Sequence, residues 1–247
     1  MAEKEWYRAW FNSPFYHKLY FERDEKEAKQ FIHHLLHHLK PSPGSLMLDA
    51  ACGKGRHSKI LASAGYEVTG IDLSPDSISY AKQFEKENLH FYLHDMRLPF
   101  WVNYFDYAFN FFTSFGYFST RREHDNAIRT LAGSLKPKGI LLFDYLNVHY
   151  SENHFVPNEI KTIDDITYNI HRWQDENHFY KKITITGPLV TTPSEFTEKV
   201  AKFSVGDFTD MLSYHKMQVT GVFGDYNLNA YDVQKTPRMI ILAKKSD

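Results

Sequence analysis

The feature that most constrains the fold of this 247-residue chain is a glycine turn directly after a short apolar run. The run at residues 46–48 ends at Asp49, then Gly53 and Gly55 follow, and a helical pattern begins at once. This order predicts a buried strand, a tight turn and a helix N-terminus. Glycines at such a turn let a ligand approach the backbone closely, and the free N–H groups and the helix dipole favour an anionic group on that ligand.

Three kinds of ligand bind at a turn of this type. A P-loop needs Gly-Lys followed by Ser or Thr after four spacer residues, and Gly53-Lys54-Gly55 lacks both features. A dinucleotide turn needs a third glycine where this chain has Ser58, and Asp49 inside the turn would repel a pyrophosphate. S-adenosylmethionine (SAM) has no phosphate, and it carries a carboxylate for the N–H groups and an ammonium for the acid. One acid followed by two glycines therefore favours SAM.

Residues 49–55, Asp-Ala-Ala-Cys-Gly-Lys-Gly, closely resemble the first motif of the class I SAM-dependent methyltransferases. Residues 70–74, Gly-Ile-Asp-Leu-Ser, resemble the second motif, and their Asp72 follows a predicted strand. An acid at that strand end can accept hydrogen bonds from both ribose hydroxyls. Asp95-Met96 resembles the third motif, which implies that the carboxylate binds the adenine amine and the Met96 N–H binds a ring nitrogen.

Aromatic side chains crowd residues 5–23. They either pack on the core or cover the cofactor, because aromatic faces attract cations such as a sulfonium. The resemblance implies that N-terminal tyrosines close over SAM, and that the end of the strand at 105–110 lies beside its methionine part. The expected cofactor-binding residues are Tyr16, Tyr20, Asp49, Ala51, Gly53, Gly55, His57, Asp72, Leu73, Asp95, Met96, Asn110 and Phe111.

The methyl acceptor is predicted to be a small molecule. Nucleobase and protein amino-methyltransferases carry Asn/Asp-Pro-Pro-Tyr/Phe after the fourth strand, whereas this chain has Asn-Phe-Phe-Thr at 110–113. The resemblance is therefore to small-molecule N- or O-methyltransferases, which release S-adenosylhomocysteine. A general base helps where the acceptor is an alcohol or a protonated amine. The weak candidates for that base are Tyr117, Tyr145, His149 and His171.

Apolar runs alternate with helical patterns up to residue 144, which predicts a parallel sheet with helices on both faces. One of these helices spans 25–39, with Asp24 as its expected N-cap. The resemblance implies a Rossmann-like, seven-stranded, mostly parallel sheet. Beyond residue 150 the periodicity changes to the alternation of antiparallel strands. We expect this antiparallel β insertion either to cover the acceptor pocket or to make a homodimer contact.

Four regions follow from these patterns. Residues 1–40 form an aromatic and helical lid segment, and residues 41–150 form the SAM-binding core. Residues 151–203 form the antiparallel insertion, and residues 204–247 add a helix and the strand pair that closes the core.

The composition bears on whether the protein binds nucleic acid, a membrane or a metal. The net charge of −1 gives no support for a nucleic-acid footprint, and no apolar run approaches the ~18 residues of a membrane span. The single cysteine, Cys52, suits the cytoplasm. The pairs His33/His37 and His34/His38 have metal-binding spacing, but no local acid or cysteine completes a site, so we predict no metal.

Two other functions stay open. A nicotinamide-dependent oxidoreductase could use the same topology, although Ser58 and Asp49 argue against it. A SAM-binding module without turnover fits the same motifs, because binding motifs do not report chemistry.

Overall fold

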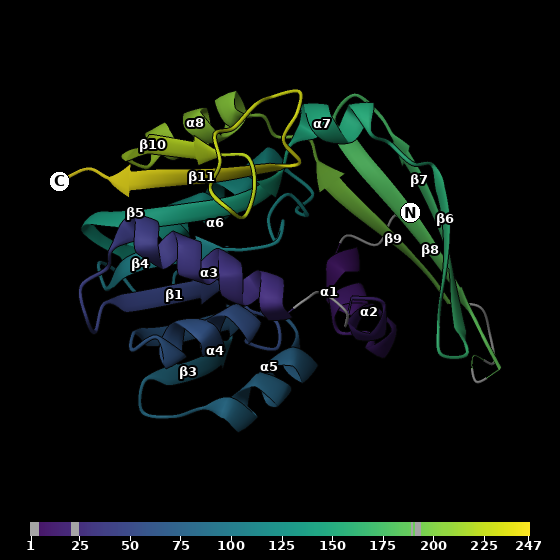
Figure 1. Cartoon of the computed structure of the whole chain (residues 1–247), viewed down its shortest axis with the longest axis horizontal. Helices are drawn as coiled ribbons and strands as arrows, with labels where there is room; N and C mark the ends of the chain where they lie inside the picture. The colour runs from purple at the N-terminus through teal and green to yellow at the C-terminus, as the bar shows by residue number, and fades with distance from the viewer. Residues whose placement is uncertain (1–4, 21–24, 189, 191–193) are drawn as a thin grey trace.

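The computed structural model describes residues 5–20, 25–188, 190 and 194–247 (Figure 1). Its larger sheet has seven strands, as predicted, and their order is β10-β11-β5-β4-β1-β2-β3. Pairing is parallel from β5 to β3, while β11 runs antiparallel to both β5 and β10. The strands are β1 Leu46–Ala50, β2 Glu67–Asp72, β3 Leu89–Leu93, β4 Phe105–Asn110, β5 Leu135–Leu146, β10 Met217–Phe223 and β11 Arg238–Lys245.

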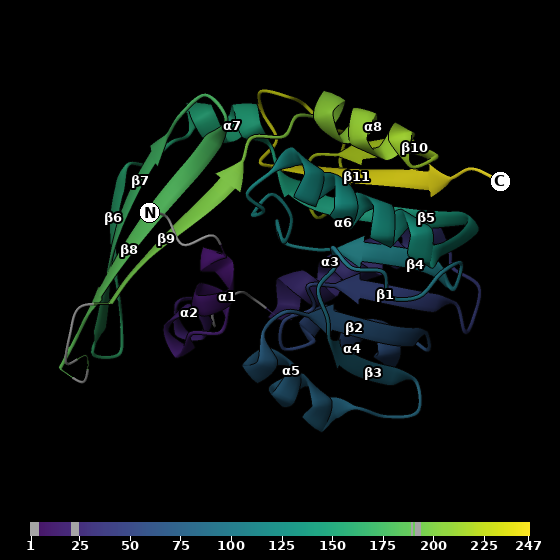
Figure 2. The same cartoon turned by 180° about the vertical axis from the view of Figure 1, so that it is seen from behind.

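Helices cover both faces of this sheet. One apolar cluster joins it to α3 (Glu25–Leu39), α4 (Arg56–Ser63) and α5 (Pro75–Ala81), the last followed by the short 3-10 helix η1 (Lys82–Phe84). The other cluster joins it to α6 (Arg121–Ser134) and α8 (Val205–Tyr214). Helix α3 lies in front of the sheet in Figure 1, and α6 lies in front in Figure 2. Two buried faces explain why the central strands are mostly apolar.

Helix starts follow local capping chemistry. Ser74 accepts from the N–H of Ser77 and caps α5, and Ser204 forms a capping box with Asp207 at the start of α8. Helix α6 begins at Arg121 because Thr120 forms a capping box with Glu123. The expected cap Asp24 lies outside the described residues. Helix α7 (Val148–Asn153), capped by Asn147, was not predicted.

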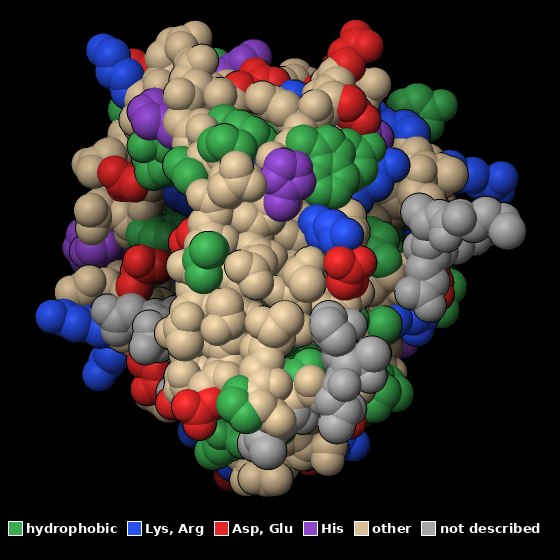
Figure 3. Space-filling view, turned by 90° about the vertical axis from the view of Figure 1, so that its right-hand side faces the viewer, with side chains coloured by type: hydrophobic (Ala, Val, Ile, Leu, Met, Phe, Trp, Pro, Cys, Tyr) green, Lys and Arg blue, Asp and Glu red, His purple; other side chains and the backbone are tan. Residues whose placement is uncertain are grey.

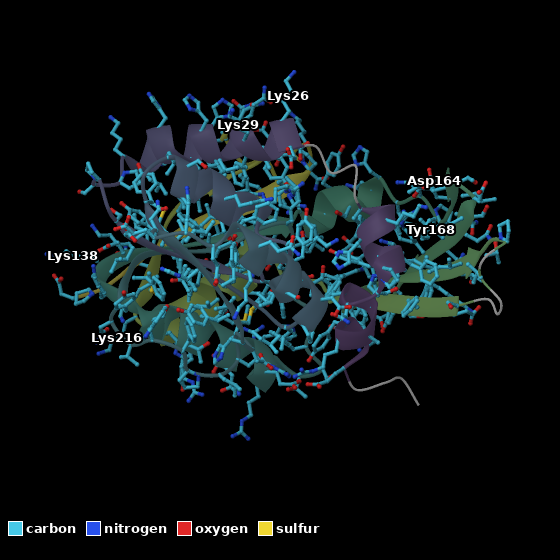
Figure 4. All side chains as sticks on the ribbon, turned by 90° about the horizontal axis from the view of Figure 1, so that it is seen from below. Lys26, Lys29, Lys138, Asp164, Tyr168 and Lys216 are labelled. Carbon is cyan, nitrogen blue, oxygen red and sulfur yellow. The ribbon has the colours of Figure 1, made fainter. Side chains whose placement is uncertain are left out.

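The insertion is a separate four-stranded antiparallel sheet, which confirms the predicted architecture. It comprises β6 (Asn158–Ile163), β7 (Ile166–Gln174), β8 (His178–Thr186) and β9 (Ser194–Ala201). Figure 4 shows labelled Asp164 and Tyr168 on this sheet, with Lys138 and Lys216 at the opposite end of the molecule. The side of the molecule seen in Figure 3 mixes hydrophobic, polar and charged side chains.

Two short helices, α1 (Trp6–Phe11) and α2 (Pro14–Leu19), lie between the two sheets (Figures 1 and 2). Trp10 is fully buried and packs with Phe196 of β9 at a ring-centroid distance of 4.6 Å. The Tyr168 hydroxyl of β7 donates to the Phe15 carbonyl at 3.2 Å. The N-terminal helices are therefore part of the core that the insertion builds, and they face the carboxyl edge of the parallel sheet.

No helix in the described part of the chain is both long enough and apolar enough to cross a membrane.

Candidate cofactor and acceptor site

A cavity of about 340 Å³ opens where the carboxyl edge of the parallel sheet meets α1, α2 and β9. The parallel strands supply one wall through the glycine turn, the end of β2 and the loop after β4. The N-terminal helices and the insertion supply the other. Ten of the residues predicted from sequence line the cavity: Tyr16, Tyr20, Ala51, Gly53, His57, Asp72, Leu73, Met96, Phe111 and Tyr117.

The glycine turn bends through three left-handed residues, Ala51, Gly53 and Gly55, with φ of 62°, 54° and 76°. A Cβ on Gly55 would lie 2.5 Å from Cζ of Phe91, so this glycine allows α4 to approach β3. A Cβ on Gly53 would meet nothing within 4 Å, because Gly53 borders the cavity. The two glycines therefore have different roles: one permits packing, and the other leaves room for a ligand.

Asp72 ties the glycine turn to the end of β2. Its carboxylate accepts from the Gly53 N–H and from the Ser74 N–H, each at 2.8 Å. Burial raises the pKa of Asp72, and these backbone N–H groups oppose that rise. Because Asp72 also lines the cavity, its carboxylate is placed to accept further hydrogen bonds from a ligand.

Asp49 lies behind the turn, outside the cavity lining. Its side chain is almost fully buried and accepts from the Ser58 hydroxyl at 2.5 Å. Burial raises the pKa of Asp49 to about 7, and the nearby charge of Asp72 adds to the rise. Gly55 and Asn110 are likewise absent from the lining, and the buried Asn110 amide donates to the Ala50 carbonyl at 3.0 Å.

Asp95 also lies outside the cavity lining, and its carboxylate pairs with two arginines. The Arg97 guanidinium donates to it at 2.7 Å, and Arg8 of α1 lies 3.5 Å away. Burial opposes the effect, but Arg97 holds the pKa of Asp95 below its ordinary value. Arg97 also donates to Glu5 at 2.8 Å. Asp95, the residue predicted to bind adenine, therefore helps to attach the N-terminal segment through Arg97. The next residue, Met96, lines the cavity.

The loop after β4 is held in a strained shape. Phe112 and Thr113 have φ of 56° and 55°, which side chains rarely adopt. The Asp144 carboxylate accepts from the Phe112 N–H at 2.8 Å, and Arg238 binds both Asp144 and the Thr113 hydroxyl. The Arg56 guanidinium covers the Phe112 ring at 4.6 Å. The loop thereby presents Phe111 and Phe112 to the cavity.

Glu198 of β9 also lines the cavity, and sequence reasoning missed it. Its Oε1 accepts from Trp10 Nε1 at 2.7 Å and from the Tyr20 hydroxyl at 3.1 Å. Its Oε2 lies 2.9 Å from Lys181 Nζ. In the sequence, Glu198 is an acid in a strand whose residues alternate between polar and apolar. This pattern is also typical of acids that face solvent, so it does not identify a site residue.

The four weak candidates for a general base are dispersed. Only Tyr117 lines the cavity. Tyr145 is fully buried, and its hydroxyl donates to the Ala201 carbonyl at 2.6 Å. His149 lies on α7 beside Glu152, and His171 lies on the exposed side of β7 beside Asn158. No cluster of three or more metal-ligating side chains occurs among the residues that the structure describes.

A parallel sheet with this strand order, a single antiparallel strand and a glycine turn after β1 is the class I SAM-dependent methyltransferase fold. Residues 47–139 match the family model described as a methyltransferase domain. This stretch of the chain is therefore similar to a methyltransferase domain, and the chain has the fold of that class.

Three similar proteins agree with this assignment. The chain is 38% identical over 107 residues to the putative methyltransferase YqeM of Bacillus subtilis (strain 168), covering 42% of this chain and 43% of that protein. It is 30% identical over 102 residues to dTDP-3-amino-3,4,6-trideoxy-alpha-D-glucopyranose N,N-dimethyltransferase of Streptomyces venezuelae, covering 40% and 42%. The matched stretch thus spans less than half the length of each relative.

The third similar protein is known from its structure. An S-adenosylmethionine-dependent methyltransferase from Clostridium acetobutylicum ATCC 824 superposes with a TM-score of 0.77 at 18% identity, covering 94% of this chain and 97% of that one. The likeness therefore extends over both sheets and shows a shared fold.

The residues present fit SAM. Open space beside Gly53 leaves room for the cofactor at the turn, and Asp72 offers a half-buried carboxylate at the cavity. Aromatic side chains, among them Tyr16, Tyr20 and Tyr117, line part of the cavity, which suits a cationic sulfonium.

Proposed function

We propose that this chain transfers the methyl group of SAM to a nitrogen or oxygen atom of a small molecule. The observation that carries the proposal is the cavity at the carboxyl edge of the sheet, which joins the glycine turn and Asp72 to a wall that contains Tyr16, Tyr20 and Tyr117. One side has the chemistry for a nucleoside, and the other leaves space for an acceptor. The relative from Streptomyces venezuelae, named as an N,N-dimethyltransferase of an amino sugar, supports a small-molecule acceptor.

We assign the cofactor contacts as follows. Asp72 accepts from the ribose hydroxyls, and the N–H groups of the glycine turn bind the methionine carboxylate. Asp49 stabilises the ammonium through the field behind the turn. Met96, which lines the cavity, binds adenine through its backbone N–H, while the Asp95 carboxylate accepts from Arg97 through both of its oxygens.

When bound, SAM supplies a methyl group already activated by its sulfonium. The chain has to orient the acceptor and exclude water, and orientation alone can supply a large part of the rate. The N-terminal helices exclude water, since Phe11, Tyr16 and Tyr20 cover the cavity. The strained loop at Phe112 and Thr113 sets the wall beside the expected methyl position.

Calorimetry with SAM, S-adenosylhomocysteine and NAD tests the cofactor. We expect SAM and S-adenosylhomocysteine to bind and NAD not to bind; binding of NAD alone would support the oxidoreductase instead. Incubation with methyl-labelled SAM and a library of amines, phenols and carboxylates then tests turnover. SAM binding without label transfer to any acceptor would favour a binding module.

The proposal also covers the cellular compartment and the oligomeric state. We place it in the cytoplasm, because its single cysteine suits a reducing compartment. We also propose a homodimer through the insertion, whose exposed side chains include Ile160 and Trp173. Light scattering after size exclusion should give twice the mass of one chain.

A further inference from the structure

The loop after β4 contains two consecutive residues with a strained backbone. Phe112 and Thr113 have φ of 56° and 55°. Threonine is branched at Cβ, and a branched residue at positive φ is an outlier that costs free energy. Such a conformation persists only where the surrounding structure holds it, and it is typical of sites where the geometry serves a function. The groups that hold this loop therefore point to the purpose of its shape.

Asp144 of β5 holds the backbone of the loop. Its carbonyl accepts from the Thr113 N–H and its carboxylate from the Phe112 N–H, each at 2.8 Å. Within the described part of the chain this carboxylate accepts four hydrogen bonds, and the other three come from the Tyr226 hydroxyl and two nitrogens of Arg238. Since a carboxylate accepts about four hydrogen bonds, Asp144 has no capacity left to bind a ligand directly.

Arg238 holds the loop from β11. Because β11 runs antiparallel to β5, its first residue lies at the carboxyl edge of the parallel strands. The Arg238 guanidinium donates to Asp144 Oδ1 through Nε at 2.8 Å and through Nη2 at 2.5 Å. Its Nη2 also donates to the Thr113 hydroxyl at 3.0 Å. One side chain therefore binds both the acid and a strained residue of the loop.

Stability alone is a poor explanation for this ion pair. The Asp144 side chain is fully buried, and that of Arg238 is 19% exposed. Two charges withdrawn from water lose hydration that their attraction barely replaces, and well-packed apolar residues are often equally stable there. What the pair adds is direction, because a planar guanidinium fixes the positions of the oxygens that it binds.

The part of the loop that is held in this way forms a wall of the cavity. Phe111, Phe112 and Ser114 line the cavity, whereas Thr113 lies outside the lining. The rings of Phe111 and Phe112 pack against His57, another lining residue, at centroid distances of 4.5 and 5.0 Å. A change of backbone at 112–113 would therefore move this wall.

We propose that Asp144 and Arg238 are positioning residues for methyl transfer, because they hold Phe112 and Thr113 in the shape that brings the loop against the methyl group of SAM. The inference rests on the proposed function, which places the methyl group beside this wall. A loop that moved outward would lose its contacts with the methyl group, and a loop that moved inward would clash with it. Either displacement weakens the binding of SAM more than that of S-adenosylhomocysteine, which lacks this methyl group.

The ratio of the dissociation constants of SAM and S-adenosylhomocysteine tests the inference, because a loss of stability alone would change both alike. Thr113→Val removes the hydroxyl that Arg238 binds and nearly keeps the shape of the side chain. Calorimetry should show that SAM affinity falls at least threefold relative to S-adenosylhomocysteine. The matched control Thr113→Ser keeps the hydroxyl and should keep the wild-type ratio. Equal ratios in the two variants would overturn the inference.

Arg238→Lys tests the other end of the same network. Lysine keeps the charge but has no planar fork, so we expect a loss of SAM affinity relative to S-adenosylhomocysteine of at least threefold here too. The control is Arg172→Lys in the insertion, which alters an ion pair with Glu159 away from the cavity and should keep the wild-type ratio.

An unchanged ratio in a folded Arg238→Lys would also overturn the inference. If Arg238→Lys does not fold, the two Thr113 variants decide. Failure of the wild type to bind either SAM or S-adenosylhomocysteine would instead count against the proposed function.

Discussion

Asp72 shows how one side chain can organise a binding site before any ligand arrives. Its carboxylate spans from the glycine turn to the residue that caps α5, through two backbone N–H groups at 2.8 Å. The carboxylate is half-buried, and partial desolvation raises its pKa. A hydrogen-bond donor on a ligand would stabilise the Asp72 carboxylate, because a charge withdrawn from water needs hydrogen bonds to compensate its lost hydration.

Replacement of this carboxylate should weaken cofactor binding. We expect Asp72→Ala to lower SAM affinity by about 1–3 kcal/mol, because it removes an acceptor and leaves polar groups unpaired. Asp72→Asn keeps one oxygen and should lose less. Calorimetry measures both, with the exposed Asp210→Ala on α8 as the control. SAM affinity unchanged in Asp72→Ala would remove this residue from the site.

Asp49 makes a prediction about stability and pH. Its pKa is raised from 3.8 to about 7, so the folded protein holds this proton more tightly than the unfolded chain does. Stability contributed at this site is therefore present below pH 4 and falls as the pH rises to 7. Asp49→Asn cannot ionise, so its free energy of unfolding relative to wild type should improve by about 2–3 kcal/mol between pH 5 and pH 8.

Urea unfolding of the apoprotein at pH 5, 6, 7 and 8 measures that difference. The exposed Asp210→Asn serves as the control and should track the wild type at every pH. Parallel curves for wild type and Asp49→Asn would show that Asp49 does not carry a raised pKa.

At the scale of elements, the loop after β4 connects the two sheets. The Gly116 carbonyl accepts from the Ala201 N–H of β9 at 2.9 Å, and the Ala201 carbonyl accepts from Tyr145 of β5. Gly116 has φ of 92°, and a Cβ there would lie 2.2 Å from the Tyr145 hydroxyl oxygen. The loop, β5 and β9 therefore pack tightly together at Ala201, which lies three residues after Glu198 on β9.

Gly116→Ala should be severely destabilising. A side chain in the left-handed region and a clash with a buried tyrosine together cost roughly 2–4 kcal/mol. Gly133→Ala is the matched control: it lies inside α6 with nothing within 4 Å of the added Cβ, and should be neutral or stabilise by about 0.5–1 kcal/mol. Denaturant unfolding of both variants tests this, and equal stabilities would contradict it.

At the scale of the whole molecule, the N-terminal helices link the parallel sheet to the insertion. Asn12 of the turn between α1 and α2 accepts from the Ser74 hydroxyl at 2.7 Å, and Glu5 pairs with Arg97 at 2.8 Å. On the other side, Trp10 donates to Glu198. The cavity is therefore covered by a segment that is attached to both of its walls.

Weakening one attachment should speed ligand release. Glu5→Gln removes a partly exposed ion pair worth about 0–1 kcal/mol, so we expect S-adenosylhomocysteine to dissociate two- to fivefold faster in stopped-flow measurements. The control is Glu87→Gln in the exposed turn before β3. Salt should accelerate release from the wild type more than from Glu5→Gln. Identical release from all three proteins would show that the helices do not gate the cavity.

The sequence by itself determined the parallel sheet, the antiparallel insertion and the glycine turn. Each of these rests on local chemistry: apolar periodicity sets strands and helices, and positive φ demands glycine at Gly55. It also placed ten of its expected site residues at the cavity, because the carboxyl ends of neighbouring parallel strands meet at one edge.

Only the tertiary structure decided which side chains face that cavity. Asp95 turns to Arg97 and Arg8, and Tyr145 is engaged by Ala201. Glu198 reaches the site only because β9 folds back against Trp10 of α1, which lies 188 residues earlier in the chain. Such pairings depend on distant segments competing for the same charges and hydrogen bonds, and no local pattern encodes the outcome of that competition.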